Sequence, residues 1–173
     1  MQISDGTARH HAADGSDLAL SIGSLGTYAH HTVVHEASCI KIEKEIPLDK
    51  ACLLGCGVVT GWGSAVYAAQ VQPGDTVAVV GCGGIGSNAI QGAKLAGARV
   101  VAAIDPVEFK REKAMEFGAT HTHASIDDAL AALPDTTWNR GFDKVIMTCG
   151  VGNGDVLGQA FWLGGKRSKI VVT

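Results

Sequence analysis

Residues 79–86 read Val79-Val80-Gly81-Cys82-Gly83-Gly84-Ile85-Gly86, and no other segment says as much about this chain. The apolar run before them, residues 75–80, predicts a buried strand. Residues 87–96 behind them show the 3.6-residue apolar spacing of a helix. The pattern Gly-x-Gly-x-x-Gly therefore stands at a strand-to-helix turn, which is the context that a dinucleotide-binding fingerprint requires.

Each glycine of this pattern has its own task. Gly81 permits a tight turn, Gly83 lets the backbone approach a pyrophosphate, and Gly86 lets the helix pack close to the sheet. Gly84 and Ile85 stand where the helix begins, and free N–H groups at that end, together with the helix dipole, hold phosphates. We therefore predict that these five residues bind the cofactor.

A second signal follows the fingerprint at the right distance. Residues 99–104 predict another apolar strand, and Asp105 comes directly after it, 19 residues beyond Gly86. In this place a carboxylate accepts hydrogen bonds from both hydroxyls of an adenosine ribose. It repels a 2′-phosphate, and no arginine immediately follows, so the sequence favours NAD. The alternative is a solvated residue at a strand end before Pro106.

Composition limits the class of protein. The 173 residues are 46% hydrophobic and 18% charged, with 23 glycines, which fits a buried parallel sheet with many tight turns. A net charge of −3 argues against nucleic acid or anionic lipid as a partner. We find no apolar run long enough to span a membrane and no signal peptide. The five cysteines form no Cys-x-x-Cys pair, which favours a reducing, cytoplasmic location.

The order of elements predicts a doubly wound parallel sheet. Residues 1–26 are polar and loop-like, and short strands are expected near 31–35 and 39–42. From Pro47 onward, strands and helices alternate, as right-handed βαβ units do. The expected helices are 48–54, a second from 60 or 61 to 69, 107–117, 126–133 and 155–163, and the further strands are 120–123, 143–147 and 169–172. Because the chain stops within that last strand, at Thr173, we expect it to be a fragment.

The segment Leu53-Leu54-Gly55-Cys56-Gly57-Val58-Val59-Thr60-Gly61-Trp62-Gly63-Ser64-Ala65 adds a family resemblance. With the fingerprint, it resembles the zinc-dependent alcohol dehydrogenases of the medium-chain dehydrogenase/reductase superfamily. The resemblance extends from about Leu25 onward, and the run 105–114 looks most like the nitrosoaniline-dependent bacterial alcohol dehydrogenases, as does 2–7. It also rests on Gly26-Thr27-Tyr28-Ala29, Thr32-Val33-Val34, Pro73-Gly74-Asp75 and Gly118-Ala119-Thr120.

The resemblance implies an architecture and a reaction. Residues 47–173 would be an NAD-binding Rossmann domain, truncated at its C-terminus, and residues 1–46 a remnant of the GroES-like catalytic domain. The parent enzyme would transfer hydride from a primary alcohol, or from the hydroxymethyl adduct of an aldehyde, to NAD. Its substrate would be a small molecule, and the parent would be a homo-oligomer.

The resemblance also assigns roles to single residues. Cys56 would be a ligand of the catalytic zinc, Thr60 would pack beside the nicotinamide, and Lys110 would touch the adenosine ribose. The alternatives are a small buried hydrophobic residue for Cys56 and an ordinary exposed lysine for Lys110. Cys52 is interpreted as a core residue and not as a partner of Cys56, because Gly55 and Gly57 interrupt the helix between them.

Elements that the family uses for catalysis do not occur in this sequence. The Gly-His-Glu element and the earlier cysteine that complete the zinc site are missing, and so are the four-cysteine zinc lobe and the proton-relay residues. One thiolate does not hold catalytic zinc, which takes three protein ligands. We expect the isolated chain to bind NAD without oxidising alcohols. The alternatives are a zinc-free reductase of the same superfamily, which leaves residues 55–57 unexplained, and a non-catalytic dinucleotide-binding module.

Overall fold

The structure, a computed structural model, describes residues 11–16, 30–32, 34–150 and 154–173. The chain divides into two units, Met1–Ile46 and Pro47–Thr173. In the described part of the first unit, the 3₁₀ helix η1 spans Glu36–Ser38. It begins at His35, whose Nδ1 accepts a hydrogen bond of 3.1 Å from the N–H of Ala37.

The strands expected near 31–35 and 39–42 are wrong for the residues that the structure describes there. The chain turns through η1 between them, and Ile40 is 89% exposed. Alternating apolar residues favour a strand only where a neighbouring strand accepts the backbone hydrogen bonds and buries one face. In the described residues, Cys39–Ile42 form no strand, and all four are exposed.

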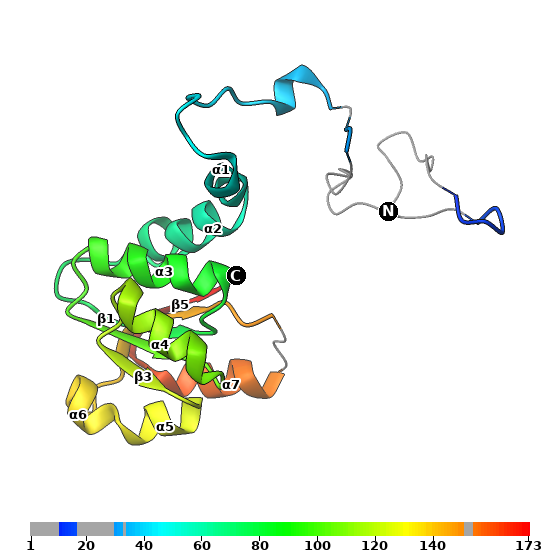
Figure 1. Cartoon of the computed structure of the whole chain (residues 1–173). Helices are drawn as coiled ribbons and strands as arrows, with labels where there is room; N and C mark the ends of the chain where they lie inside the picture. Colours follow the sequence, from blue (N-terminus) through cyan, green and yellow to red (C-terminus); the bar gives the residue numbers. More distant parts are fainter. Residues whose placement is uncertain (1–10, 17–29, 33, 151–153) are drawn as a thin grey trace. The chain divides into compact units, whose positions relative to one another are not determined.

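The second unit contains a five-stranded sheet (Figure 1). The strands are β1 (Thr76–Val80), β2 (Val100–Ile104), β3 (His121–His123), β4 (Phe142–Met147) and β5 (Gly164–Val172). Their order is β3-β2-β1-β4-β5, and every neighbouring pair is parallel. The chain moves outward from β1 to β3 and then returns to place β4 on the other side of β1. The doubly wound parallel sheet is confirmed, and its switch point lies between β1 and β4, where open α/β sheets bind their ligands.

Helices cover both faces of this sheet (Figure 1). One face packs against α3 (Gly84–Leu95) and α4 (Glu108–Phe117), and the other against α5 (Ile126–Ala131) and α7 (Gly154–Leu163). Successive residues of β1 alternate between the two cores because strand side chains alternate in direction. Val77 and Val79 enter the core beneath α3, and Ala78 and Val80 enter the core beneath α7.

Two helices precede the sheet in sequence. The first, α1 (Leu48–Leu54), contains no buried residue, and α2 (Gly57–Gly63) continues as a π-helical turn, η2 (Ser64–Ala68). The predicted glycine break is confirmed, because α1 ends at Leu54 and α2 begins at Gly57. The predicted start of the second helix at 60 or 61 is wrong. Cys52 is exposed, so its interpretation as a core residue is also wrong.

Two further elements differ from expectation. The helix expected over 126–133 ends at Ala131, and a separate helix α6 (Leu133–Thr137) follows it. Strand β5 begins at Gly164 instead of residue 169, and its pairing with β4 shifts register between Phe142 and Lys144. Arg167 lies within this irregular part and has a φ of +65°. Short-range periodicity carries no signal for such a β-bulge.

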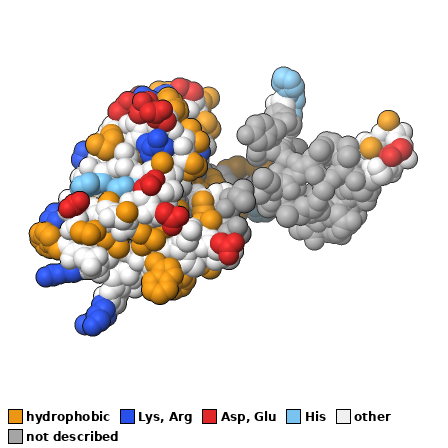
Figure 2. All heavy atoms as spheres, turned by 90° about the horizontal axis from the view of Figure 1, so that it is seen from below, with side chains coloured by type: hydrophobic (Ala, Val, Ile, Leu, Met, Phe, Trp, Pro, Cys, Tyr) orange, Lys and Arg blue, Asp and Glu red, His pale blue; other side chains and the backbone are white. Residues whose placement is uncertain are grey.

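The distribution of basic side chains on the surface and the length of the apolar helices are relevant to binding of nucleic acid or membranes. On the face drawn in Figure 2, lysine and arginine side chains lie apart from one another, among acidic and hydrophobic ones. Within the described residues, no single helix has the length and apolar composition to cross a membrane. Helix α1 and the continuous helix Gly57–Ala68 pass that test only together, and they are bent by 45° at the break between them.

Candidate functional site

The glycine turn joins the carboxyl end of β1 to the start of α3. Gly81 has a φ of +92°, in the left-handed region that suits glycine. Its N–H donates to the carbonyl oxygen of Ile104 at 2.8 Å, which ties the turn to the end of β2. A Cβ at this position would lie 2.8 Å from the backbone nitrogen of Cys149. Both the backbone conformation and the close approach therefore require glycine at 81.

Gly86 is required for a different reason. A Cβ there would overlap the carbonyl oxygen of Gly81 and would lie 2.7 Å from Oγ1 of Thr148. The first turn of α3 therefore rests directly on the end of β1. No Cβ could be added without moving backbone atoms, which is costly in a close-packed interior.

Gly83 and Gly84 face open space. Gly83 is the N-cap of α3, its missing side chain makes no capping bond, and a Cβ at either glycine would meet nothing within 4 Å. The first N–H groups of a helix have no partner within that helix. Because no capping side chain occupies them here, these groups are available to an anion at the carboxyl edge of the sheet.

Asp105 lies at the end of β2 and is only 4% exposed. Its Oδ2 accepts a hydrogen bond from the N–H of Cys82 at 2.8 Å, and its Oδ1 accepts one from the N–H of Val107 at 2.9 Å. Nζ of Lys110 lies 3.7 Å from Oδ2. The alternative of a solvated strand-end residue is therefore wrong. Burial, and then the charge of Asp105, raise the pKa of the Cys82 thiol to about 12.

A cavity of about 520 Å³ opens over the carboxyl ends of the strands. Its volume falls within the range that ligand sites commonly have. The structure brings four predicted residues to this cavity, namely Gly81, Gly83, Asp105 and Lys110. The rest of its wall comes from the ends of β1 and β2 (Val80 and Ile104), residues 106–107, residues 124–126, the loop after β4 (148–150) and α7 (Val156 and Gln159).

The sequence places the loop 148–150 at the cofactor edge of the sheet, as the structure confirms, but assigns no role to Thr148. Its hydroxyl donates to the carbonyl oxygen of Gly81 at 2.6 Å. The signal available in the sequence was weak, since sheet topology places the loop after β4 at the same edge as the glycine turn but does not say which side chain reaches it.

Helix α2 lies directly against the first turn of α3. A Cβ at Gly61 would overlap the carbonyl oxygen of Ile85 and would lie 2.7 Å from Cβ of Asn88. This contact puts Thr60 on the helix beside the glycine turn, half-buried, with its carbonyl oxygen accepting from Oγ of Ser64 at 2.8 Å. The cavity at the strand ends does not include Thr60 in its lining.

Cys56 lies at the N-terminal end of α2, between the two helices, with φ −146°. Its thiol is exposed, so the alternative of a small buried hydrophobic residue is wrong. Within the described residues, no group of three or more histidine, cysteine, aspartate or glutamate side chains could hold a metal ion. Among the residues that the structure describes, Cys56 therefore belongs to no such group.

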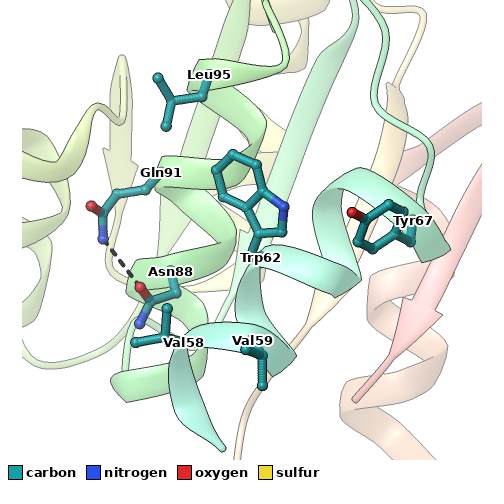
Figure 3. A pocket seen from close by; sticks show the side chains of 7 residues that line it. All are labelled: Val58, Val59, Trp62, Tyr67, Asn88, Gln91 and Leu95. Carbon is teal, nitrogen blue, oxygen red and sulfur yellow. Dashed lines mark hydrogen bonds between the residues drawn. The ribbon is translucent and has the colours of Figure 1, made fainter. Parts of the chain in front are cut away.

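A second, more apolar groove of about 400 Å³ lies between α2, η2 and α3. In Figure 3 the Trp62 ring reaches across toward Leu95, and the amide of Gln91 contacts that of Asn88 at 3.5 Å. The groove runs along the helices and contains no residue of the glycine turn. Sequence analysis did not predict it.

Comparison with known proteins finds dehydrogenases, both among family models and among single relatives. A family model described as "Zinc-binding dehydrogenase" matches residues 84–173. The chain is 46% identical over 169 residues to the NDMA-dependent alcohol dehydrogenase of Amycolatopsis methanolica, covering 98% of this chain and 45% of that protein. It is 51% identical over 116 residues to S-(hydroxymethyl)glutathione dehydrogenase of Saccharomyces cerevisiae, covering 67% of this chain and 30% of that protein.

Solved structures agree in fold. An alcohol dehydrogenase zinc-binding domain protein from Burkholderia ambifaria matches with a TM-score of 0.80 at 30% identity, over 98% of this chain and 45% of that one. Benzyl alcohol dehydrogenase from Acinetobacter calcoaceticus matches with a TM-score of 0.77 at 29% identity, over 87% of this chain and 41% of that one. The predicted resemblance, including that to the nitrosoaniline-dependent enzymes, is confirmed. The chain spans about half the length of these proteins or less.

Proposed function

Because the chain belongs to the zinc-binding dehydrogenase family, we propose that it is the NAD-binding part of an oxidoreductase that transfers hydride from a primary alcohol, or from the hydroxymethyl adduct of an aldehyde, to NAD. The names of its relatives support these substrate classes, since they specify alcohols and S-(hydroxymethyl)glutathione. Residues 1–46 would be a remnant of the catalytic domain. The parent enzyme would be a cytoplasmic homo-oligomer.

The observation that carries the proposal is the cavity at the switch point of the sheet. It combines Gly81 and Gly83 of the turn with the carboxylate of Asp105 and the ammonium of Lys110. A pyrophosphate would take the uncapped N–H groups at the start of α3, contributed by Gly84, Ile85 and their neighbours. Gly81, Gly83, Asp105 and Lys110 lie around one space, which supports binding of the adenosine diphosphate end of a dinucleotide there.

Asp105 accounts for a preference for NAD. Each carboxylate oxygen has about two lone-pair sites, and one backbone N–H occupies one site on each oxygen. One site per oxygen is left for the two ribose hydroxyls, with Lys110 alongside. A 2′-phosphate would instead bring like charge against a buried carboxylate, which is unfavourable in this low-dielectric position.

The work of this chain in the reaction is to hold and orient the cofactor. NAD, when bound, supplies the hydride acceptor at its nicotinamide ring. The glycine turn would fix the phosphates and Asp105 the ribose, so that the far end of the cofactor extends from a rigid anchor. Thr60, on the helix that packs against the turn, would contact the nicotinamide.

The residues described do not fit a zinc site by themselves. Cys56 offers an exposed sulfur ligand, and in the described part of the chain it belongs to no group of three or more potential ligands. We propose Cys56 as one ligand of a zinc ion whose other ligands lie outside this part. The chain on its own would bind NAD without oxidising alcohols.

Binding of the reduced cofactor tests the first half of the proposal. The 173-residue chain is titrated with NADH, followed by energy transfer from tryptophan to the nicotinamide, and then with NADPH. We expect a saturable NADH curve with a dissociation constant between about 1 μM and 1 mM, and binding of NADPH at least about tenfold weaker. Absence of saturation, or equal binding of NADPH, would contradict the proposal.

Turnover tests the second half. NADH formation from benzyl alcohol and NAD is followed with added zinc and, separately, with a chelator. We expect none above the protein-free rate in either case. Turnover that requires zinc would contradict the proposed lack of a metal site in this chain. Reduction of a carbonyl substrate by NADH in the presence of chelator would favour the zinc-free reductase.

A further inference from the structure

We propose that Thr148 is a positioning residue of the glycine turn. Its hydroxyl holds the carbonyl of Gly81 inward, between β4 and the first turn of α3, so that N–H groups and not a carbonyl oxygen face the dinucleotide phosphates. This inference rests on the proposed binding of NAD for its functional meaning. The geometry that supports it is independent of any ligand.

The Thr148 hydroxyl is held by its backbone. Its N–H donates to the carbonyl oxygen of Val80 at 2.8 Å, which extends the pairing of β4 with β1 by one residue. From this fixed position Oγ1 lies 2.6 Å from the carbonyl oxygen of Gly81 and 3.4 Å from that of Val80. The shorter contact is the geometry of a good hydroxyl-to-carbonyl hydrogen bond.

The neighbouring peptide groups of the turn are held from the other side. The N–H of Gly81 donates to Ile104 at 2.8 Å, and the N–H of Cys82 donates to Asp105 at 2.8 Å. Strand β2 therefore fixes the two N–H groups, and Thr148 at the end of β4 fixes the carbonyl. The turn is clamped between the two neighbours of β1, and the clamp from β4 uses a side chain.

The direction of this carbonyl matters for an anion. A carbonyl oxygen carries negative partial charge, so one that faced the phosphates would oppose the attraction of the α3 N–H groups. Held inward, it occupies the space that a Cβ at Gly86 would fill, next to Thr148 Oγ1. Gly86 leaves room for this carbonyl, and Thr148 bonds to it, so both residues keep it directed inward.

Substitutions at Thr148 and at Thr76, each followed by two readouts, test the inference. Thr148→Val removes the hydroxyl at nearly equal volume, and Thr148→Ser keeps it. Thr76→Val is the matched control, because Thr76 lies at the opposite end of β1, where its Oγ1 donates to Oδ2 of Asp143 at 2.8 Å. Each variant is compared with the parent chain by hydrogen exchange of the amides in 81–86 and by titration with NADH.

We expect Thr148→Val to weaken NADH binding about five- to tenfold, the loss that one such hydrogen bond carries, and to speed amide exchange in 81–86. Thr148→Ser and Thr76→Val should stay within about twofold of the parent in both readouts. A structural role alone would make Thr76→Val behave like Thr148→Val, because both lose a hydroxyl that bonds to a neighbouring strand or its end.

Unchanged exchange in 81–86 for Thr148→Val would overturn the inference, whatever NADH does. If the parent chain binds no NADH, the proposed function fails, and exchange alone decides whether Thr148 positions the turn. Thr148→Ala repeats the loss of the hydroxyl with a smaller side chain, so a clash caused by valine does not decide the result. Rescue by serine in either readout supports the inference.

Discussion

Two regions of the second unit differ in how completely the chain surrounds them. One is the glycine turn (81–86), and the other is the Cys56 corner, the break between α1 and α2 at residues 55–56. At the turn, the peptide groups around Gly81 have partners on both neighbouring strands, and Asp105 is buried with both oxygens engaged. At the corner, Cys56 is exposed, and α1 beside it buries no residue.

This difference separates two kinds of site. A dinucleotide turn is made from consecutive backbone groups and from the ends of adjacent strands, so one sheet supplies all of it. A catalytic zinc site needs three side chains that converge from distant segments. The described part of this chain brings residues proposed for the first kind of site to one cavity, and it offers one residue, Cys56, proposed for the second.

The largest expected contrast is in thiol reactivity. Only the thiolate reacts with iodoacetamide, and with a pKa of about 12 Cys82 has about one thiolate in ten thousand molecules at pH 8. We expect Cys82, whose thiol pKa is raised, to be alkylated far more slowly than Cys56, which is exposed. Peptide mass spectrometry over a time course measures both sites in one sample. Comparable rates would mean that the turn is open in solution.

Next in size is the effect of a methyl group inside the turn. Gly86→Ala should lower the free energy of unfolding by about 2–3 kcal/mol, because its Cβ overlaps backbone atoms. Gly84→Ala is the matched control, since a Cβ there meets nothing within 4 Å, and should change stability by less than about 0.5 kcal/mol. Urea unfolding measures both. Equal stability of the two variants would show that the turn is looser than described.

A smaller effect on NADH binding is expected when the carboxylate of Asp105, which bonds to the turn from the end of β2, is replaced by a neutral amide. Asp105→Asn keeps the shape but loses the charge, and its amide nitrogen cannot accept from an N–H, so NADH should bind about tenfold more weakly. Asp143→Asn is the control at the opposite edge, where Asp143 accepts from Thr76. If the two variants bind NADH alike, Asp105 has no specific part in cofactor binding.

The smallest effect is expected at the corner. Cys56→Ser changes an exposed thiol that caps no helix N–H, so stability should shift by less than about 0.5 kcal/mol, and NADH binding should not change. Urea unfolding and NADH titration together test this. A marked loss of NADH binding would instead show that Cys56 is coupled to the cofactor site within this chain.

The sheet could be predicted because its signals are local. Buried strands at 75–80 and 99–104 and the helices behind them show their periodicity within a few residues, and strict alternation then limits the topology. The predicted strands at 31–35 and 39–42 failed because strand formation depends on a partner, which the pattern does not contain.

The site was predictable in part for the same reason. Gly81, Gly83 and Asp105 belong to a motif with fixed spacing, so their meeting at one cavity follows from the fold. Thr148 lies far from the motif in sequence and reaches it only through the pairing of β4 with β1. The exposure of Cys52 likewise depends on what packs against α1, which a helical pattern alone does not reveal.

Equilibrium dialysis of the chain against NADH and zinc together, followed by assay of both in the protein compartment, tests the central claim most directly. A weak chelator in the outer buffer removes loosely held metal. The account predicts stoichiometric NADH and no retained zinc, unchanged in Cys56→Ser. Retention of zinc in a Cys56-dependent manner, with no NADH bound, would contradict it.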